Sequence, residues 1–395
     1  ALGLVPPLPS PRRAPDFSHG FTLSTHLVPA AYPRTTAYFS SFPPAPENET
    51  KEERQIRVRK LELELWDLRR RYEKGELDEM EKNENVLWMC FNRYVRRSAE
   101  RDGKQTGLTL FCAHANGMHK ETFEPMLHRL LALSEKDDSY RIDEIWTFDA
   151  VQHGDSALVN GNRSGPLYDW MDNTRDMLNF LLHYLPETVS SMPLPIHLEE
   201  LPARVVAKRR KEGFSARHLV AVGHSFGGCT LVLGAYHMPE IFSGLALIDP
   251  VILPAPPSMD RSTALRNYVA NSFARRSSWP SRDEAYMLLK KSPFFRSWDD
   301  NVLSHYVLYA MTPTLNGQVR LKCSGYDEAY VFADRLASWE AFTVLPAVDS
   351  RIPIKWIVCP ARLSVAERED VQQARVWRRP VNTTSVVLSD GGHLV

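Results

Sequence analysis

The feature that most constrains this chain is a regular alternation of short apolar runs and helical patterns that starts near residue 106. Short, nearly continuous apolar runs that alternate with amphipathic helices are typical of strands buried on both faces. We therefore expect an α/β fold, with a mostly parallel central sheet and helices on both of its faces. The expected strands are 108–112, 145–148, 218–222 and 245–248, and the expected helices are 120–134, 170–185 and 226–237.

The alternation stops after Pro250 and returns near residue 354. Residues 256–345 show helical periodicity and many aromatic side chains, so we expect a helical cap inserted into the sheet-bearing domain. That domain is expected to comprise residues 17–255 and 346–395. Its last part should contain strands at 354–358 and 385–388 with a helix at 365–378 between them.

Three segments precede the alternation. Residues 1–16 contain five prolines, which lack an N–H and fix φ, so a disordered Pro-rich lead-in is expected. Strands are expected at 21–28 and 86–95. Between them, residues 53–72 form a charged helix whose apolar stripe lasts barely two heptads, which favours packing on the domain surface over a partner-binding coiled coil. The absence of an initiator Met and the ending at Val395 suggest a fragment or a processed chain.

The composition excludes several classes of protein. Apolar residues make up 43% and charged residues 24% of the 395 residues, which is typical of a globular protein. Lys plus Arg and Asp plus Glu number 48 each, and a net charge of zero argues against a nucleic-acid or membrane-surface partner. No apolar run approaches the ~20 residues of a transmembrane helix. The five cysteines form no CxxC pair or Cys/His cluster, so we expect no disulfide framework and no zinc ribbon, and an intracellular, reducing compartment. Neither a metal nor a cofactor is expected.

The segment Gly223-His224-Ser225-Phe226-Gly227 matches the pattern G-x-S-x-G between an expected strand and an expected helix. In this context a sharp turn presents the serine as a nucleophile, and the flanking glycines have no Cβ to clash with the turn. With this motif, residues 85–393 resemble the α/β-hydrolase superfamily.

The resemblance implies partners for Ser225. A serine hydroxyl needs a base, and in this superfamily the base is a histidine late in the chain. His393, in the turn after the last expected strand, is the predicted base, whereas His224 is interpreted as structural. The acid that orients His393 is predicted to be Asp249, which follows the strand expected at 245–248, and Glu367 remains the alternative.

The oxyanion hole is predicted after the strand that ends near Cys112, where the loop resembles the His-Gly-x-x loop of the fold. Ala115 stands there in the usual Gly place. The backbone N–H groups of Phe226 and Asn116 would stabilise the developing oxyanion, with the Asn116 side chain as a further donor.

A narrower resemblance rests on residues 149–157, 170–176, 223–227 and 247–252. They resemble a fungal group that includes the budding-yeast peroxisomal lipase and hydrolases of host-selective-toxin biosynthesis. We expect His153, Asp155 and Arg175 to order the loop beside the pocket, with substrate contact as the alternative. The resemblance implies a peroxisome, although this chain ends His-Leu-Val and carries no Ser-Lys-Leu type tripeptide.

The sequence therefore predicts a cytoplasmic or peroxisomal serine hydrolase that is lipase- or esterase-like. Its substrate would be a small-molecule carboxylic ester or thioester with an apolar acyl part, because the expected cap is rich in aromatic residues. The alternatives are acyl transfer or C–C bond hydrolysis in fungal secondary metabolism, and a non-catalytic binding module on the same fold. The oligomeric state is left open.

Overall fold

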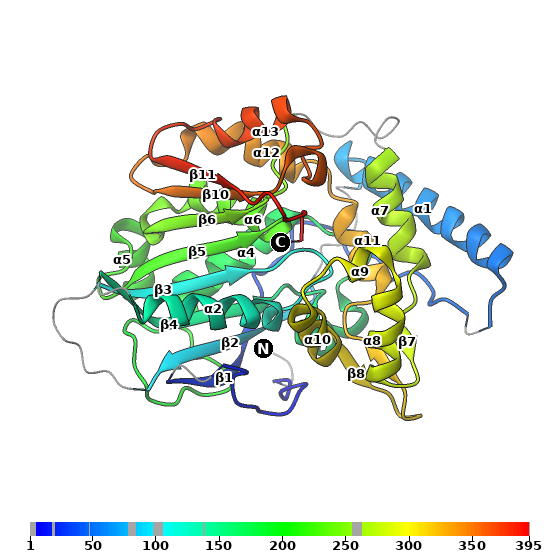
Figure 1. The fold of residues 1–395 in the computed structure, drawn as a ribbon, viewed down its shortest axis with the longest axis horizontal. Helices are drawn as coiled ribbons and strands as arrows, with labels where there is room; N and C mark the ends of the chain where they lie inside the picture. The colour runs from blue at the N-terminus through cyan, green and yellow to red at the C-terminus, as the bar shows by residue number, and fades with distance from the viewer. Residues whose placement is uncertain are drawn as a thin grey trace.

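The computed structural model of the chain describes residues 5–17, 20–46, 48–77, 84–97, 106–136, 139–254 and 263–394. An eight-stranded sheet with the order β1-β2-β4-β3-β5-β6-β10-β11 forms its centre (Figure 1). β1 pairs antiparallel with β2, and β2 pairs antiparallel with β4. The six strands β4, β3, β5, β6, β10 and β11 are parallel to one another, which confirms the predicted fold class. The strands are β1 (Phe21–Pro29), β2 (Trp88–Arg96), β3 (Thr106–Ala113), β4 (Tyr140–Asp149), β5 (His218–His224), β6 (Gly244–Ile248), β10 (Ile354–Val358) and β11 (Thr383–Val387).

Helices cover both faces of the sheet, as nearly continuous apolar strands require. On one face, α2 (Glu124–Ser134) buries Leu127 and Leu131 against side chains of β3 and β4. On the other face, α4 (Trp170–Asn179), α6 (Phe226–His237) and α12 (Ala337–Val344) share the main core. The remaining helices of this part are α3 (Gly154–Asn160), α5 (Ala203–Glu212) and α13 (Glu369–Val376).

Residues 263–332, here called the cap segment, are inserted between β6 and β10 and lie beside the sheet (Figure 1). The cap segment also contains a three-stranded sheet, β7-β9-β8, which the sequence analysis did not predict. Strands of two or three residues are too short to show an alternating pattern. Residues 256–262 lie outside the described residues, and α12, predicted within the cap, packs in the main core instead. The elements are α7 (Thr263–Ala274), β7 (Ser278–Trp279), α8 (Arg282–Lys291), α9 (Pro293–Arg296), α10 (Asp300–Tyr309), β8 (Met311–Pro313), β9 (Val319–Leu321) and α11 (Gly325–Phe332).

The charged helix α1 (Lys51–Glu73) packs against the cap segment and not against the sheet (Figure 1). It begins at Thr50, whose hydroxyl accepts from the Glu53 N–H while the Glu53 carboxylate accepts from the Thr50 N–H. Such a capping box satisfies two N–H groups that a helix start leaves unpaired. Its buried residues Leu61, Leu65 and Trp66 form one cluster with α7 and α11.

Residues 5–17, which overlap the extended or disordered lead-in expected at 1–16, contact other parts of the protein through side chains. We call this segment the N-terminal strap. Ser10 Oγ donates to Asp155 Oδ1 at 2.6 Å, and Asp16 Oδ2 lies 3.0 Å from His305 Nε2 on α10. The strap therefore touches both the sheet-bearing part and the cap segment. Residues 1–4 lie outside the described residues.

Two further expectations concern membranes and cysteines. Within the described ranges, none of the helices is both long and apolar enough to span a bilayer. All five cysteines are buried and none is disulfide-bonded. They serve the core as small apolar residues.

Candidate active site

Ser225 occupies a sharp turn between β5 and α6 with φ 54° and ψ −117°. Only close-packed glycines permit this turn. A Cβ on Gly227 would lie 2.3 Å from the Ala113 carbonyl oxygen, and a Cβ on Gly223 would lie 2.6 Å from the backbone of α6. A side chain at either position would collide with backbone, so the two glycines are required where the serine is presented.

The structure brings Ser225, His393 and Asp249 into one chain of hydrogen bonds. Ser225 Oγ lies 2.9 Å from His393 Nε2, and His393 Nδ1 lies 2.6 Å from Asp249 Oδ2. His393 is 168 positions from Ser225 and 144 from Asp249 in sequence. The serine is 6% exposed and the carboxylate is fully buried, whereas the imidazole is partly open to solvent. This is the connectivity that a Ser-His-Asp triad requires.

Asp249 is held rigidly at the end of β6. Its φ is 34°, a strained value for a residue with a side chain, and its N–H donates to the Ile357 carbonyl of β10 at 2.8 Å. Ser364 Oγ donates to Asp249 Oδ1 at 2.7 Å. Burial raises the pKa of Asp249, but the hydrogen bond from His393 and the charge of Arg375 outweigh burial and leave the pKa well below its usual range. The group is therefore a carboxylate at neutral pH.

The alternative acid, Glu367, lies in a different environment. It is exposed, it has φ 58°, and it makes no hydrogen bond to His393. Of the two candidates that the sequence left open, Asp249 is the one in contact with the imidazole.

His224, next to the serine, supports the loop that carries His393. Its Nε2 lies 2.7 Å from the His393 carbonyl oxygen. Burial, with a smaller contribution from His393, lowers the pKa of His224 to about 4. A neutral imidazole has one N–H, and the carbonyl oxygen can only accept, so His224 Nε2–H is the donor.

The predicted oxyanion loop begins beside the serine, because Ala113 of β3 pairs in register with Gly223 of β5. Phe226 is the first residue of α6, where backbone N–H groups have no partner within the helix. The amide group of the Asn116 side chain, expected as a further donor to the oxyanion, makes a different hydrogen bond. Its Nδ2 donates to the Glu328 carbonyl of α11 at 3.1 Å, which fastens this loop to the cap segment.

Two buried histidines join the oxyanion loop to the loop after β4. His114 Nε2 accepts from the Ala150 N–H at 3.1 Å. His153 Nε2 lies 3.1 Å from the Gly117 nitrogen and 2.9 Å from Asn116 Oδ1. Burial lowers the pKa of His114 to about 4 and that of His153 well below its usual range. Both rings are therefore neutral, and the contact of His153 agrees with its predicted ordering of the loop.

Asp155 belongs to a buried ion cluster that the sequence analysis missed, here called the Lys120 cluster. Lys120 Nζ lies 2.7 Å from both Asp149 and Asp155 and 3.0 Å from Glu121, and Lys322 of the cap segment lies 2.6 Å from Asp155. Burial lowers the pKa of Lys120, but the three carboxylates raise it well above its usual value. The cluster fixes the start of α2 to the loop after β4 and to the cap segment.

Arg175, the third residue expected near the pocket, lies on α4 in an ion pair with Asp172 at 2.7 Å. Asp172 also contacts the buried Arg34 at 3.3 Å, and Asp176 contacts Arg34 at 2.6 Å. These ion pairs tie α4 to the segment after β1.

A cavity of about 130 Å³ lies near the three hydrogen-bonded residues, although none of the three is among its lining residues. Its walls include His224 and Leu394, the chain neighbours of Ser225 and His393. The apolar part of the lining comes from the loop after β3, from η1 (Lys120–Phe123) with α2, and from the segment entering α10: Met118, Phe123, Met126, Trp298 and Val302. Such a lining suits an apolar group.

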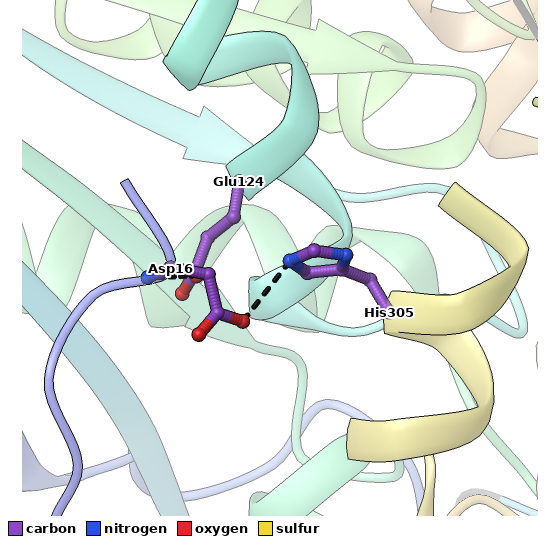
Figure 2. A group of neighbouring side chains, drawn as sticks. All are labelled: Asp16, Glu124 and His305. Atoms are coloured by element: carbon purple, nitrogen blue, oxygen red, sulfur yellow. Dashed lines mark hydrogen bonds and ion pairs between the residues drawn. The ribbon is translucent and has the colours of Figure 1, made fainter. Parts of the chain in front are cut away.

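Figure 2 shows Asp16, Glu124 and His305, whose ligand atoms lie within 4.8 Å of one another. The Glu124 carboxylate already accepts from Arg13, from Tyr94 Oη at 2.5 Å and from the Asp16 N–H at 3.1 Å. The Arg13 guanidinium would also repel a cation at this position. We therefore assign this group to holding the N-terminal strap, and not to binding a metal.

Comparison with known proteins places this arrangement in a family. Residues 110–395 match the profile described as the Alpha/beta hydrolase family. The chain belongs to the α/β-hydrolase family. Among curated relatives, the type I acyl-CoA thioesterase mpaH of Penicillium roqueforti is 29% identical over 57% of this hydrolase and 45% of its own length. The peroxisomal membrane protein LPX1 of Saccharomyces cerevisiae is 32% identical over 40% of this chain and 35% of its own length. The chain thus spans less than half the length of these two relatives.

A solved structure extends the similarity in fold. The peroxisomal alpha-beta-hydrolase Lpx1 from Saccharomyces cerevisiae has a TM-score of 0.64 at 20% identity, covering 95% of this hydrolase and 84% of that chain. This similarity reaches far beyond residues 110–395 and includes most of the cap segment and the N-terminal part. It agrees with the expected fold.

Proposed function

We propose that this protein is a serine hydrolase that cleaves a carboxylic ester or thioester with an apolar acyl part. The observation that carries the proposal is the chain of hydrogen bonds from Ser225 through His393 to Asp249 at the turn between β5 and α6. Family membership supports a hydrolase, and the largely apolar cavity lined in part by His224 and Leu394, the chain neighbours of Ser225 and His393, supports an apolar acyl group.

In the proposed acylation step, Ser225 Oγ attacks the carbonyl carbon while His393 Nε2 takes the hydroxyl proton. The backbone N–H groups of Phe226 and Asn116 are assigned to stabilise the negative charge on the carbonyl oxygen. Asp249 holds His393 Nδ1–H and stabilises the imidazolium. The imidazolium then protonates the departing alcohol or thiol, and the acyl group remains on Ser225.

In the second step, water attacks the acyl-serine, and His393 takes a proton from it. The intermediate collapses, the carboxylic acid leaves, and the proton returns to Ser225. No metal or cofactor is needed for these steps. The partly open position of His393 gives water a route to the imidazole.

Thioesters are the first substrates to test, because relatives that share 29–30% identity are described as acyl-CoA thioesterases. A peroxisomal location rests on the similarity to Lpx1 alone and is part of the proposal.

The proposal is tested with a fluorophosphonate probe and with acyl-thioester and acyl-ester panels of increasing chain length. The wild type should be labelled and turn over substrate, and Ser225→Ala should do neither. Asp249→Asn should lower kcat about 10³- to 10⁴-fold, as loss of a triad carboxylate does, whereas Glu367→Gln should have little effect. Turnover by Ser225→Ala within a few-fold of wild type would contradict the assignment.

The same experiments separate the alternatives. Products in which the acyl group is joined to an added alcohol or amine would indicate acyl transfer. Cleavage of a C–C bond in place of the ester would indicate C–C bond hydrolysis. Absence of labelling in folded wild-type protein would favour a binding module.

A further inference from the structure

A buried arginine lies on the far side of the Asp249 carboxylate from His393. Arg375 of α13 is fully buried, and its Nη2 forms an ion pair with Asp249 Oδ1. The same Nη2 donates to Ser364 Oγ at 2.7 Å, and Nη1 donates to the Pro250 carbonyl at 2.6 Å. Resting on the proposed function, we propose that Arg375 is a positioning residue that orients Asp249 and, through the charge it places behind that carboxylate, affects the pH profile of the reaction.

The contacts of Asp249 divide between its two oxygens. Oδ1 accepts from Arg375 and from Ser364 Oγ. Oδ2 accepts from His393 Nδ1 at 2.6 Å, and its other contacts are long, at 3.7 Å to Cys359 Sγ and 3.4 Å to the Val365 N–H. With Oδ1 held from behind, the carboxylate cannot rotate, and Oδ2 stays aimed at the imidazole. Orientation of this kind lowers the cost of reaching the reactive geometry.

Arg375 is also the charge that faces the carboxylate at neutral pH. Two other titratable groups lie near Asp249. Burial and, secondarily, Asp249 raise the pKa of the Cys359 thiol to about 11, and burial lowers the pKa of His224 to about 4, so both are neutral. The protonated form of His393 therefore meets one carboxylate that is already paired with a guanidinium.

This pairing has a consequence for the reaction. The positive charge of Arg375 opposes the positive charge that His393 takes up during the reaction, so loss of the guanidinium should change the pH profile of activity. The pair also keeps Asp249 ionised, which a buried carboxyl group otherwise resists. An apolar side chain at 375 could fill the space but could supply neither effect.

The test compares Arg375→Met, Arg375→Lys and the control Arg379→Met through pH profiles of kcat/KM from pH 5 to 9. Arg379 is also buried near the end of α13, but it donates only to backbone carbonyls, at 2.7 Å to Asp349 and 2.7 Å to Ile352. Arg375→Met should lower the plateau about 10- to 100-fold, as loss of contacts behind a reactive group does in metal sites. It should also move the pH of half-maximal kcat/KM upward by roughly one unit.

Arg375→Lys keeps the positive charge, so its pH of half-maximal kcat/KM should equal that of the wild type. Its plateau value of kcat/KM should lie between those of Arg375→Met and the wild type. Arg379→Met should keep the wild-type midpoint. If Arg375→Met matches Arg379→Met in both midpoint and plateau, the inference is wrong. A wild type without Ser225-dependent activity overturns the proposed function instead, so the two failures are distinguishable.

Two further variants keep the test decisive if Arg375→Met does not fold. Ser364→Ala removes one contact to Oδ1 but leaves the charge, and should lower kcat without moving the midpoint. In the Asp249→Asn background, Arg375→Lys should cause no additional loss, because Arg375 acts through the carboxylate. Additive losses in that pair would contradict the proposal.

Discussion

The Lys120 cluster provides a prediction whose size follows from the structure. Lys120→Met preserves most of the side-chain volume but removes a fully buried ammonium group. Asp149, Asp155 and Glu121 then share the single positive charge of Lys322. Removing one partner from a buried ion pair costs about 3–5 kcal/mol, so the free energy of unfolding should fall by that amount at neutral pH.

The loss should depend on pH in a defined direction. In the wild type, burial raises the pKa of Asp155, but Lys120 and Lys322 outweigh burial and lower it to about 2. The stabilisation from this carboxylate is therefore complete above its unfolded pKa and is lost only as the pH falls toward 2. In the variant, the buried carboxylates lack their main partner and their pKa values rise. The folded variant then takes up protons on acidification, and the difference from wild type should be smaller at pH 5 than at pH 8.

Urea unfolding followed by circular dichroism at pH 5 and pH 8 measures both effects. Lys60→Met is the control, because Lys60 is mostly exposed and its pair with Glu64 spans 3.7 Å on the surface of α1. Exposed pairs of this kind contribute less than about 1 kcal/mol. A loss below ~1 kcal/mol for Lys120→Met, or an equal loss at both pH values, would refute the reasoning.

Three further predictions concern the loop that carries His393, the start of α4 and the cavity. His224→Phe removes the hydrogen bond to the His393 carbonyl, and because one such bond contributes about 0.5–1.5 kcal/mol, kcat should fall roughly 2- to 12-fold in a steady-state assay; an unchanged kcat would mean that packing alone holds the loop. Burial, and then the charge of Asp334, raise the pKa of Asp169 in the folded protein to about 7. The ionised carboxyl group therefore lowers the free energy of unfolding increasingly as the pH rises from about 4 to 7, so Asp169→Asn should raise Tm more at pH 8 than at pH 5. Thermal scans showing the reverse order would contradict this. Trp298→Ala enlarges the cavity and should shift the chain-length panel toward longer acyl groups, whereas an unchanged preference would place the acyl group elsewhere.

Features encoded by neighbouring residues were predictable from the sequence. Strand and helix periodicity gave the sheet and its covering helices, and Gly223 and Gly227 marked the turn at Ser225 because only glycine fits there. The side chains of Ser225, His393 and Asp249 were named together from the resemblance, and the structure brings them within hydrogen-bonding distance.

Features that depend on distant partners were not predictable. Arg375 has the sequence context of an ordinary helix residue, and its importance appears only when Asp249, 126 positions away, lies against it. Lys120 likewise follows a loop and gives no sign of burial until β4 and the cap segment surround it. The contacts of the N-terminal strap with Asp155 and His305 were likewise not predictable, because proline content does not reveal side-chain partners across the molecule.

The hydrogen bond from Asn116 to the Glu328 carbonyl adds to the ion pair of Lys322 with Asp155 in joining the cap segment to the sheet-bearing part. It ties the position of α11 to the loop that follows β3. The cap segment and the proposed donors to a negative oxygen therefore share one anchor. A substitution at Asn116 would disturb both at once, although the contacts of its side chain are with Glu328 and His153 and not with Ser225 or His393.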